Sequence, residues 1–300
     1  MINAAEAVKK ASIARKVIPA YNAPFPEMIE PIVRAIADEN SIGMIQVARI
    51  EWEKFGAISP ETIAKEYHRV MDSEHTLLHL DHIPVIDEDG SPCDYMSVIK
   101  RAINCGYESV MVDGSRLPFK ENVKASELAV SEAHIHNIPC EAELGKVSGH
   151  ESGPRLPYEQ IFKERIGFTN AFEASEFVRL TGCDWLSIAA GSVHGSVAES
   201  LKFEKKPDAR LDIEHIKNLH SSAGIPLVLH GGSGIGRKFI HQGVCAGISK
   251  INIGTEIRQA YLRALEANGY LSAANAVYEK VRLIISEELE ISGLKTLLFS

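Results

Sequence analysis

The sequence contains few cysteines, and none of them have the spacing that metal or redox motifs use. Its 300 residues include five cysteines, scattered at positions 93, 105, 140, 183 and 245 with no Cys-x-x-Cys pair. An odd, dispersed set favours reduced thiols over a disulfide framework. The first residues also lack the basic and apolar blocks of a secretory signal. We therefore expect a cytoplasmic enzyme.

Long apolar runs and a basic surplus are missing as well. No apolar stretch approaches the roughly 20 residues that a membrane-spanning helix needs. Lysine and arginine total 32 against 40 acidic residues, a net charge of -8, so nothing favours nucleic acid or anionic lipid as a partner. The hydrophobic fraction of 45% is ample for a large core. Because no linker, low-complexity tract or internal repeat is present, residues 1–300 are expected to form a single domain.

Short apolar runs alternate with amphipathic stretches along the whole chain. The predicted strands cover residues 17–21, 42–47, 76–80, 109–112, 139–143, 185–189, 226–229 and 250–253. The predicted helices between them cover residues 27–38, 60–71, 96–105, 121–136, 171–181, 212–222 and 237–245. This alternation predicts an α/β fold, a single (β/α)8 TIM barrel with an extra N-terminal helix at 4–14 and a long C-terminal helix. A doubly wound open sheet is disfavoured, because polar strand ends occur throughout the chain.

Three histidines lie at the ends of predicted strands three, six and seven: His82, His194 and His230. Imidazoles that converge from separate strands and leave one position open are typical of a catalytic zinc site. A strand-end histidine is by itself more often structural, but three in this topological position favour a metal. His79, two residues before Asp81, is expected to support a neighbouring site residue or to have a core role, not to bind the metal.

Several carboxylates accompany these histidines. Asp81 precedes His82 and could exchange a proton with a metal-bound group, or merely orient an imidazole. Glu141 and Glu143 alternate on the fifth strand, so both face the same side. Asp113 ends the fourth strand and, with Glu143, forms either a second metal position or a hydrogen-bonded polar layer.

Two glycine-containing turns follow the last strands, at Gly231-Gly232-Ser233-Gly234 and Asn252-Ile253-Gly254-Thr255. The loops after strands seven and eight of this barrel repeatedly bind phosphate through backbone N–H groups and a helix N-terminus. Two longer connections, at 83–92 and 145–169, are expected at the same mouth, and the second is typical of a mobile lid. Glu151 lies on it.

These segments together resemble the class II, zinc-dependent ketose-bisphosphate aldolases, which include fructose- and tagatose-bisphosphate aldolases. The resemblance runs from about residue 4 to residue 290. It is carried by segments 20–22, 79–82, 111–118, 141–145 and 252–256.

The resemblance implies a role for each matching residue. His82, His194 and His230 would hold one zinc ion, Asp81 would be the proton donor, and Glu151 would act as acid and base. The dihydroxyacetone phosphate half would be bound by Gly195, Gly231, Gly232, Ser233, Asn252, Ile253, Gly254 and Thr255. Asp113 and Glu143 match an additional metal position, and many members use a monovalent cation. The expected reaction is reversible cleavage of a phosphorylated ketose to dihydroxyacetone phosphate and an aldehyde through a metal-stabilised enediolate, in a homodimer or homotetramer.

The sequence departs from the family pattern near the expected aldehyde side of the pocket. Ala48 stands where the family commonly has the serine of Gln-x-Ser, Ile83 replaces a usual glycine, and Gly254 replaces an aspartate. We therefore expect an arginine to pair with an anionic group on the aldehyde. The candidates are Arg49, Arg116 and Arg155.

Other functions share parts of this pattern. A Schiff-base aldolase would use a desolvated lysine, Lys250 or Lys146, but would leave the three histidines unexplained. A metal-dependent sugar-phosphate isomerase or epimerase would use the same enediolate chemistry without breaking a bond. A non-catalytic sugar-phosphate-binding aldolase subunit is expected to lose metal or acid–base residues, and here they are all present.

Overall fold

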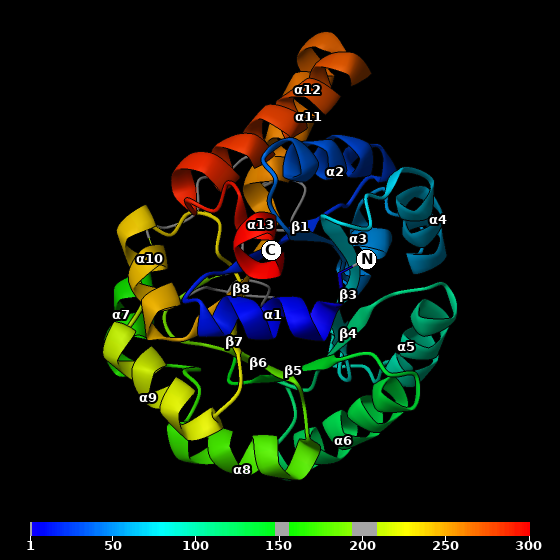
Figure 1. Ribbon diagram of the computed structural model, residues 1–300. Helices are drawn as coiled ribbons and strands as arrows, with labels where there is room; N and C mark the ends of the chain where they lie inside the picture. Colours follow the sequence, from blue (N-terminus) through cyan, green and yellow to red (C-terminus); the bar gives the residue numbers. More distant parts are fainter. Residues whose placement is uncertain (1, 148–155, 194–208) are drawn as a thin grey trace.

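The computed structural model describes residues 2–147, 156–193 and 209–300 (Figure 1). In this part of the chain, parallel strands β1 to β8 close into a barrel in sequential order, with β8 pairing with β1. The prediction of an α/β barrel is confirmed. The strands are β1 (Ile18–Asn22), β2 (Gly43–Val47), β3 (Thr76–Pro84), β4 (Ser109–Asp113), β5 (Cys140–Leu144), β6 (Trp185–Ile188), β7 (Leu227–Leu229) and β8 (Ile248–Ile253).

Helices surround the barrel and cover the outer face of its strands (Figure 1). The α-helices are α1 (Ala4–Ile13), α2 (Ile29–Asp38), α3 (Arg49–Lys54), α4 (Pro60–Val70), α5 (Tyr95–Asn104), α6 (Phe119–Ile135), α7 (Tyr158–Glu164), α8 (Ala171–Thr181), α9 (Ile213–Ala223), α10 (Arg237–Ala246), α11 (Thr255–Asn268), α12 (Tyr270–Leu283) and α13 (Leu294–Phe299). The described residues also form a 3-10 turn, η1 (Pro26–Met28), and a π turn, η3 (Ile284–Glu288). None of the described helices is long and apolar enough to cross a membrane.

The strands are buried on both faces, as sheets covered by helices require. Every residue of β2, β5 and β8 is buried. Their outward-facing residues are mostly apolar and pack against helices. The inward-facing residues include polar ones, and they fill the barrel interior rather than leaving a pore.

The extra N-terminal helix lies at the end of the barrel where the strands begin. Helix α1 crosses this end (Figure 1), and the N–H of Ile2 donates to the carbonyl of Ser73, just before β3. Its buried residues recur at helical spacing, at Ala4, Ala7, Val8 and Ala11. The opposite end, where the strands finish, therefore remains available for a site.

Three features differ from the sequence-based prediction. Helices α3 and α7 lie in stretches without a strong apolar period and were not predicted. The C-terminal helical region is a pair, α11 and α12, that projects away from the barrel (Figure 1). Strand β3 continues to Pro84 instead of ending at residue 80, so Asp81 and His82 belong to the strand itself.

Candidate active site

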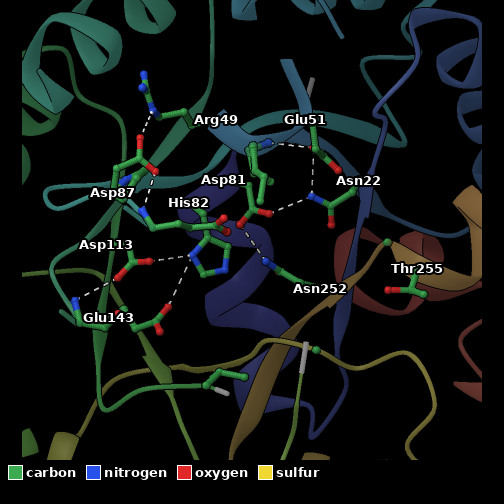
Figure 2. A pocket seen from close by; sticks show the side chains of 18 of the residues that line it. Asn22, Arg49, Glu51, Asp81, His82, Asp87, Asp113, Glu143, Asn252 and Thr255 are labelled. Carbon is green, nitrogen blue, oxygen red and sulfur yellow. Dashed lines mark hydrogen bonds and ion pairs between the residues drawn. The ribbon is translucent and has the colours of Figure 1, made fainter. Parts of the chain in front are cut away.

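The carboxyl ends of the strands surround one pocket, and most of the predicted site residues that the structure describes line it (Figure 2). They reach the pocket from β3, β4, β5, β8 and the turns after β7 and β8. The predicted residues that line it are Asp81, His82, Asp113, Glu143, Gly231, Ser233, Asn252, Gly254 and Thr255. Residues far apart in the sequence thus share one concave surface, the usual place for an active site in this fold.

A break in strand pairing explains how two consecutive residues of β3 both face this pocket. The register between β3 and β4 shifts between Leu80 and Ile83. In a regular strand Asp81 and His82 would point to opposite faces, but a bulge re-aims a side chain. Both residues therefore line the pocket.

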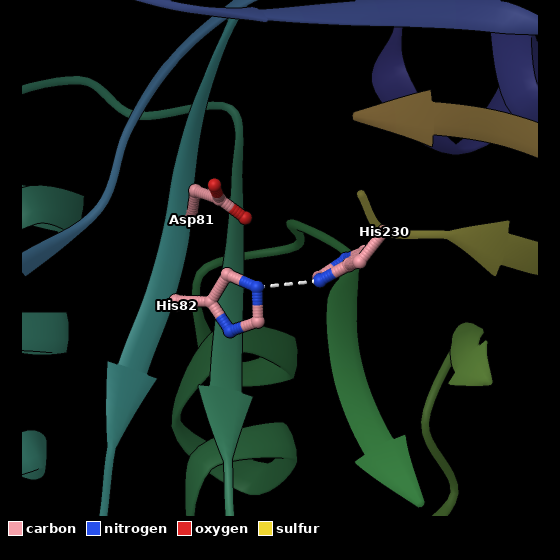
Figure 3. Close-up of side chains that lie close together, drawn as sticks. All are labelled: Asp81, His82 and His230. Carbon is pink, nitrogen blue, oxygen red and sulfur yellow. Dashed lines mark hydrogen bonds between the residues drawn. The ribbon is translucent and has the colours of Figure 1, made fainter. Parts of the chain in front are cut away.

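The rings of His82 and His230 face each other across the barrel mouth (Figure 3). The distance between His82 Nε2 and His230 Nδ1 is 2.5 Å. Ligand atoms of Asp81, His82 and His230 all lie within 4.8 Å of one another. These two nitrogens could therefore serve the same ion.

The other nitrogen of each ring is held by a carboxylate. His82 Nδ1 lies 3.2 Å from Asp113 Oδ2 and 3.7 Å from Glu143 Oε2. His230 Nε2 lies 2.7 Å from Glu141 Oε1. Carboxylates in this position fix the orientation of metal-binding imidazoles. Ligand atoms of His82, Asp113 and Glu143 form a second group that could hold a metal.

The charges around the two rings also fit a bound cation. Burial disfavours the charged imidazolium of His82, but Asp81, Asp113 and Glu143 outweigh it and raise the pKa to about 10. Burial raises the pKa of Glu143 well above its ordinary value, and the neighbouring Asp113 carboxylate raises it further. So many buried carboxylates need a compensating positive charge, which either a proton or a divalent ion can supply. The donor set therefore suits zinc, which imidazole and carboxylate ligands bind.

Three side-chain amides hold Asp81 in place. Its Oδ2 accepts from Asn22 Nδ2 at 2.8 Å and Gln46 Nε2 at 3.2 Å, and its Oδ1 accepts from Asn252 Nδ2 at 2.9 Å. Burial alone would raise the pKa of Asp81, but the nearby His82 and other cationic groups lower it. Asp81 is therefore an oriented carboxylate at the wall of the pocket.

Glu51 of helix α3 is a second carboxyl group at this wall. Its Oε2 accepts from the Ala48 N–H at 2.8 Å and from Asn22 Nδ2 at 3.3 Å. Burial raises its pKa to about 8. The hydrogen bond from Ala48 opposes this rise but is weaker than burial, and the nearby Asp81 carboxylate raises the pKa further. At neutral pH Glu51 is therefore mostly protonated, unlike Asp81.

The two predicted phosphate turns lie side by side. The Gly232 N–H donates to the Asn252 carbonyl at 3.2 Å, which joins them. Thr255 begins helix α11, a 14-residue helix whose N-terminus therefore opens on the pocket. Three predicted residues do not line the pocket: Gly232, Ile253 and His230. The Ile253 side chain is buried in the core, and the His230 side chain is fully buried with only its Nδ1 facing His82.

Some predicted residues lie outside the described part of the chain. They are Glu151, Arg155, His194 and Gly195. Their roles remain predictions that the sequence and the resemblance support.

Arg49 is already engaged by carboxylates of its own chain. Its Nη2 lies 2.5 Å from Glu53 Oε1 and its Nε lies 3.1 Å from Asp87 Oδ2. A second ion pair joins Lys54 to Glu88, at 2.6 Å. The insertion after β3 is thus tied to α3. Arg49 lines the pocket together with Arg116, so pairing of an arginine with an anionic aldehyde stays a prediction, with Arg49 already held by these carboxylates.

Lys250 cannot serve as a Schiff-base nucleophile in this arrangement. It is fully buried, does not line the pocket, and lies 2.9 Å from Glu141 Oε2. Lys146 does line the pocket, but a lysine there leaves the facing histidines without a role.

A family model described as fructose-bisphosphate aldolase class-II matches residues 2–293. The chain belongs to this family. The protein is therefore a lyase of the aldolase type, and the alternative of a non-catalytic subunit is set aside.

Solved structures of aldolases have the same fold. The YdjI aldolase from Escherichia coli K12 superposes with a TM-score of 0.74 at 24% identity, covering 98% of this chain and 99% of the other. Fructose-bisphosphate aldolase from Campylobacter jejuni gives a TM-score of 0.73 at 18% identity, covering 95% of this chain and 93% of the other. At these identities the likeness concerns the fold.

Sequence reasoning assigned no role to three residues that line the pocket or hold Asp81: Asn22, Gln46 and Glu51. The first two are polar residues on otherwise apolar strands β1 and β2, and this signal could have singled them out. Glu51 lies in the short helix α3, and no pattern in the sequence distinguishes it from an exposed glutamate.

Proposed function

We propose that this aldolase is zinc-dependent and cleaves a phosphorylated ketose to dihydroxyacetone phosphate and an aldehyde. The observation that carries the proposal is the facing pair His82 Nε2 and His230 Nδ1, each ring anchored on its other nitrogen by a carboxylate. His194 is proposed as the third ligand. Bound zinc would act as a Lewis acid that stabilises negative charge on the ketone oxygen.

In the cleavage direction we assign the first proton transfer to Asp81. Its carboxylate takes the proton of the hydroxyl group that becomes the aldehyde oxygen, and the adjacent carbon–carbon bond then breaks. The electron pair of that bond stays on the dihydroxyacetone phosphate fragment, which Glu151 protonates. In the synthetic direction Asp81 returns its proton to the new hydroxyl. The amides of Asn22 and Asn252 hold the carboxylate in position for both directions.

The phosphate of the substrate is assigned to the two joined turns. Gly231, Ser233 and Gly254 line the pocket there, and Thr255 begins α11. Backbone N–H groups and the positive end of a helix bind phosphate well. Gly195 and a monovalent cation are proposed to contribute to the same site, and Asp113 with Glu143 to offer an alternate metal position next to His82.

We propose a cytoplasmic homodimer or homotetramer. All five cysteines are free thiols, which fits a reducing compartment. At the tip of the projecting α11–α12 pair, Tyr270 and Leu271 are 66% and 90% exposed, which favours burial against another subunit. Light scattering on wild type and Leu271→Glu tests this: a smaller assembly in the variant supports the proposal, and a monomeric wild type contradicts it.

A cleavage panel tests the proposed reaction. Fructose and tagatose bisphosphates, the corresponding 1-phosphates and phosphorylated ketose acids are incubated with enzyme, and dihydroxyacetone phosphate is detected by a coupled assay. Turnover that disappears on chelation and returns with zinc is expected. Interconversion of ketoses without release of two fragments would identify an isomerase or epimerase instead, and borohydride trapping of substrate on lysine would identify a Schiff-base enzyme.

A further inference from the structure

Lys250 of β8 is a fully buried lysine in the barrel interior, beneath the pocket rather than in its lining. Its ammonium group has two close partners. It lies 2.9 Å from Glu141 Oε2 and donates to Asn252 Oδ1 at 2.6 Å. Each partner also forms a hydrogen bond with a residue of the proposed site: Glu141 with His230, and Asn252 with Asp81.

The first branch leads to the proposed zinc ligand His230. Glu141 Oε1 lies 2.7 Å from His230 Nε2, and both side chains are fully buried. A carboxylate accepts hydrogen bonds, so the ring proton lies on Nε2 and the lone pair on Nδ1. Nδ1 is the nitrogen that faces His82. Lys250 compensates the buried charge of Glu141, which would be costly without a partner.

The second branch leads to Asp81. The two ends of an amide are distinguished only by their partners, and an ammonium group can only donate. The Asn252 carbonyl oxygen must therefore face Lys250. This orientation turns Asn252 Nδ2 toward Asp81 Oδ1, where it donates at 2.9 Å.

We propose that Lys250 is a positioning residue that sets the metal-binding nitrogen of His230 and the orientation of the Asp81 carboxylate at the same time. The inference rests on the proposed function for the roles of His230 and Asp81. A lysine with a purely structural role would affect the stability of the barrel alone. A positioning lysine also changes zinc affinity and the proton transfer of Asp81.

The test measures zinc binding and catalysis separately on the full-length chain. The zinc dissociation constant of stripped protein is measured by competition with a chromophoric chelator, and the absorption spectrum of the cobalt-substituted protein reports ligand geometry. Lys250→Met is expected to weaken zinc binding by up to about 10–100-fold, the loss typical when the group that orients a ligand is disturbed, because Lys250 holds the Glu141 carboxylate that orients His230. Its cleavage rate at saturating zinc is also expected to fall.

Two further variants separate the branches. Asn252→Leu breaks the Asp81 branch and leaves the Glu141–His230 branch in place, so zinc affinity is expected to stay within about two-fold of wild type. Because Asn252 also lines the pocket, zinc affinity and not cleavage is the quantity that this variant tests. Lys295→Met is the matched control, because this lysine pairs with Glu74 at 2.8 Å near the start of β3, far from the pocket. It is expected to change neither quantity.

The single lysine variant leaves Glu141 as an uncompensated buried charge and can unfold. Glu141→Gln/Lys250→Met removes both charges and keeps side chains of similar shape. If the single variant does not fold, this double variant is compared with Glu141→Gln alone, so that the effect of Lys250 is separated from that of Glu141. Weaker zinc binding and an altered cobalt spectrum in a folded variant support the proposal. Unchanged zinc affinity and spectrum, with only a lower melting temperature, overturn it. Failure of wild type to cleave any ketose phosphate would contradict the proposed function and leave the zinc measurement valid.

Discussion

Replacing Asp81 by asparagine tests whether Asp81 and Glu151 carry out separate proton transfers, as proposed. The carboxylate accepts three amide hydrogen bonds, one at Oδ1 and two at Oδ2. An asparagine has only one acceptor oxygen, so in either orientation its NH2 group faces at least one amide donor. Asn252 is the donor left without an acceptor in the less costly orientation.

The expected magnitudes follow from this geometry. A hydrogen bond to a charged group contributes about 1.5–3 kcal/mol to folding stability. Because Asp81→Asn loses one such bond, its free energy of unfolding should fall by roughly that amount. Loss of a positioned general acid or base typically slows a reaction by about 10²–10⁴-fold. Ketose cleavage should fall within this range.

Isotope exchange separates the steps. In the proposed mechanism, enzyme and dihydroxyacetone phosphate in deuterated water exchange a carbon-bound proton, and this exchange would need the metal site and Glu151 but no aldehyde. We expect Asp81→Asn to retain most of this exchange, measured by NMR, while cleavage is nearly lost. If exchange and cleavage fell in parallel, Asp81 would not be specific to the hydroxyl proton, and its assigned role would be wrong.

Two further predictions concern stability. Burial raises the pKa of Glu51 to about 8 from the usual 4.5. Between these two pH values the folded protein binds more protons than the unfolded chain. The contribution of Glu51 to the free energy of unfolding therefore falls as pH rises through that window. Urea unfolding should therefore show Glu51→Gln gaining stability over wild type from pH 5 to pH 8, by at most about 1.4 kcal/mol per pH unit, and a constant difference would refute it. Gly145 has φ +90° and an added Cβ would lie 2.5 Å from Thr169 Oγ1, whereas Gly90 has φ +85° and open space. Gly145→Ala should thus cost about 1–3 kcal/mol more than Gly90→Ala, and equal losses would show that the packing around Gly145 is not as described.

The barrel could be predicted because local sequence patterns mark its strands. Apolar runs bounded by polar residues mark each strand, and helical periods separate them, so no long-range information is needed to count them. The strand-end residues His82, Asp113 and His230 followed from the same reasoning. Carboxyl ends of parallel strands must meet at one mouth.

The finer features of the site depend on contacts that no local pattern records. The bulge in β3 that turns both Asp81 and His82 into the pocket is a property of pairing with β4. The engagement of Arg49 by Asp87 depends on how the insertion folds back on α3. The role inferred for Lys250 likewise arises only when β5, β7 and β8 close around it.

The most direct test is anomalous diffraction at the zinc absorption edge from crystals of the zinc-loaded protein. The account predicts a peak about 2.1 Å from both His82 Nε2 and His230 Nδ1, with these nitrogens moved apart from 2.5 Å to about 3.3 Å. A fully loaded crystal whose peak lay at other residues, with the two rings still in contact, would contradict it.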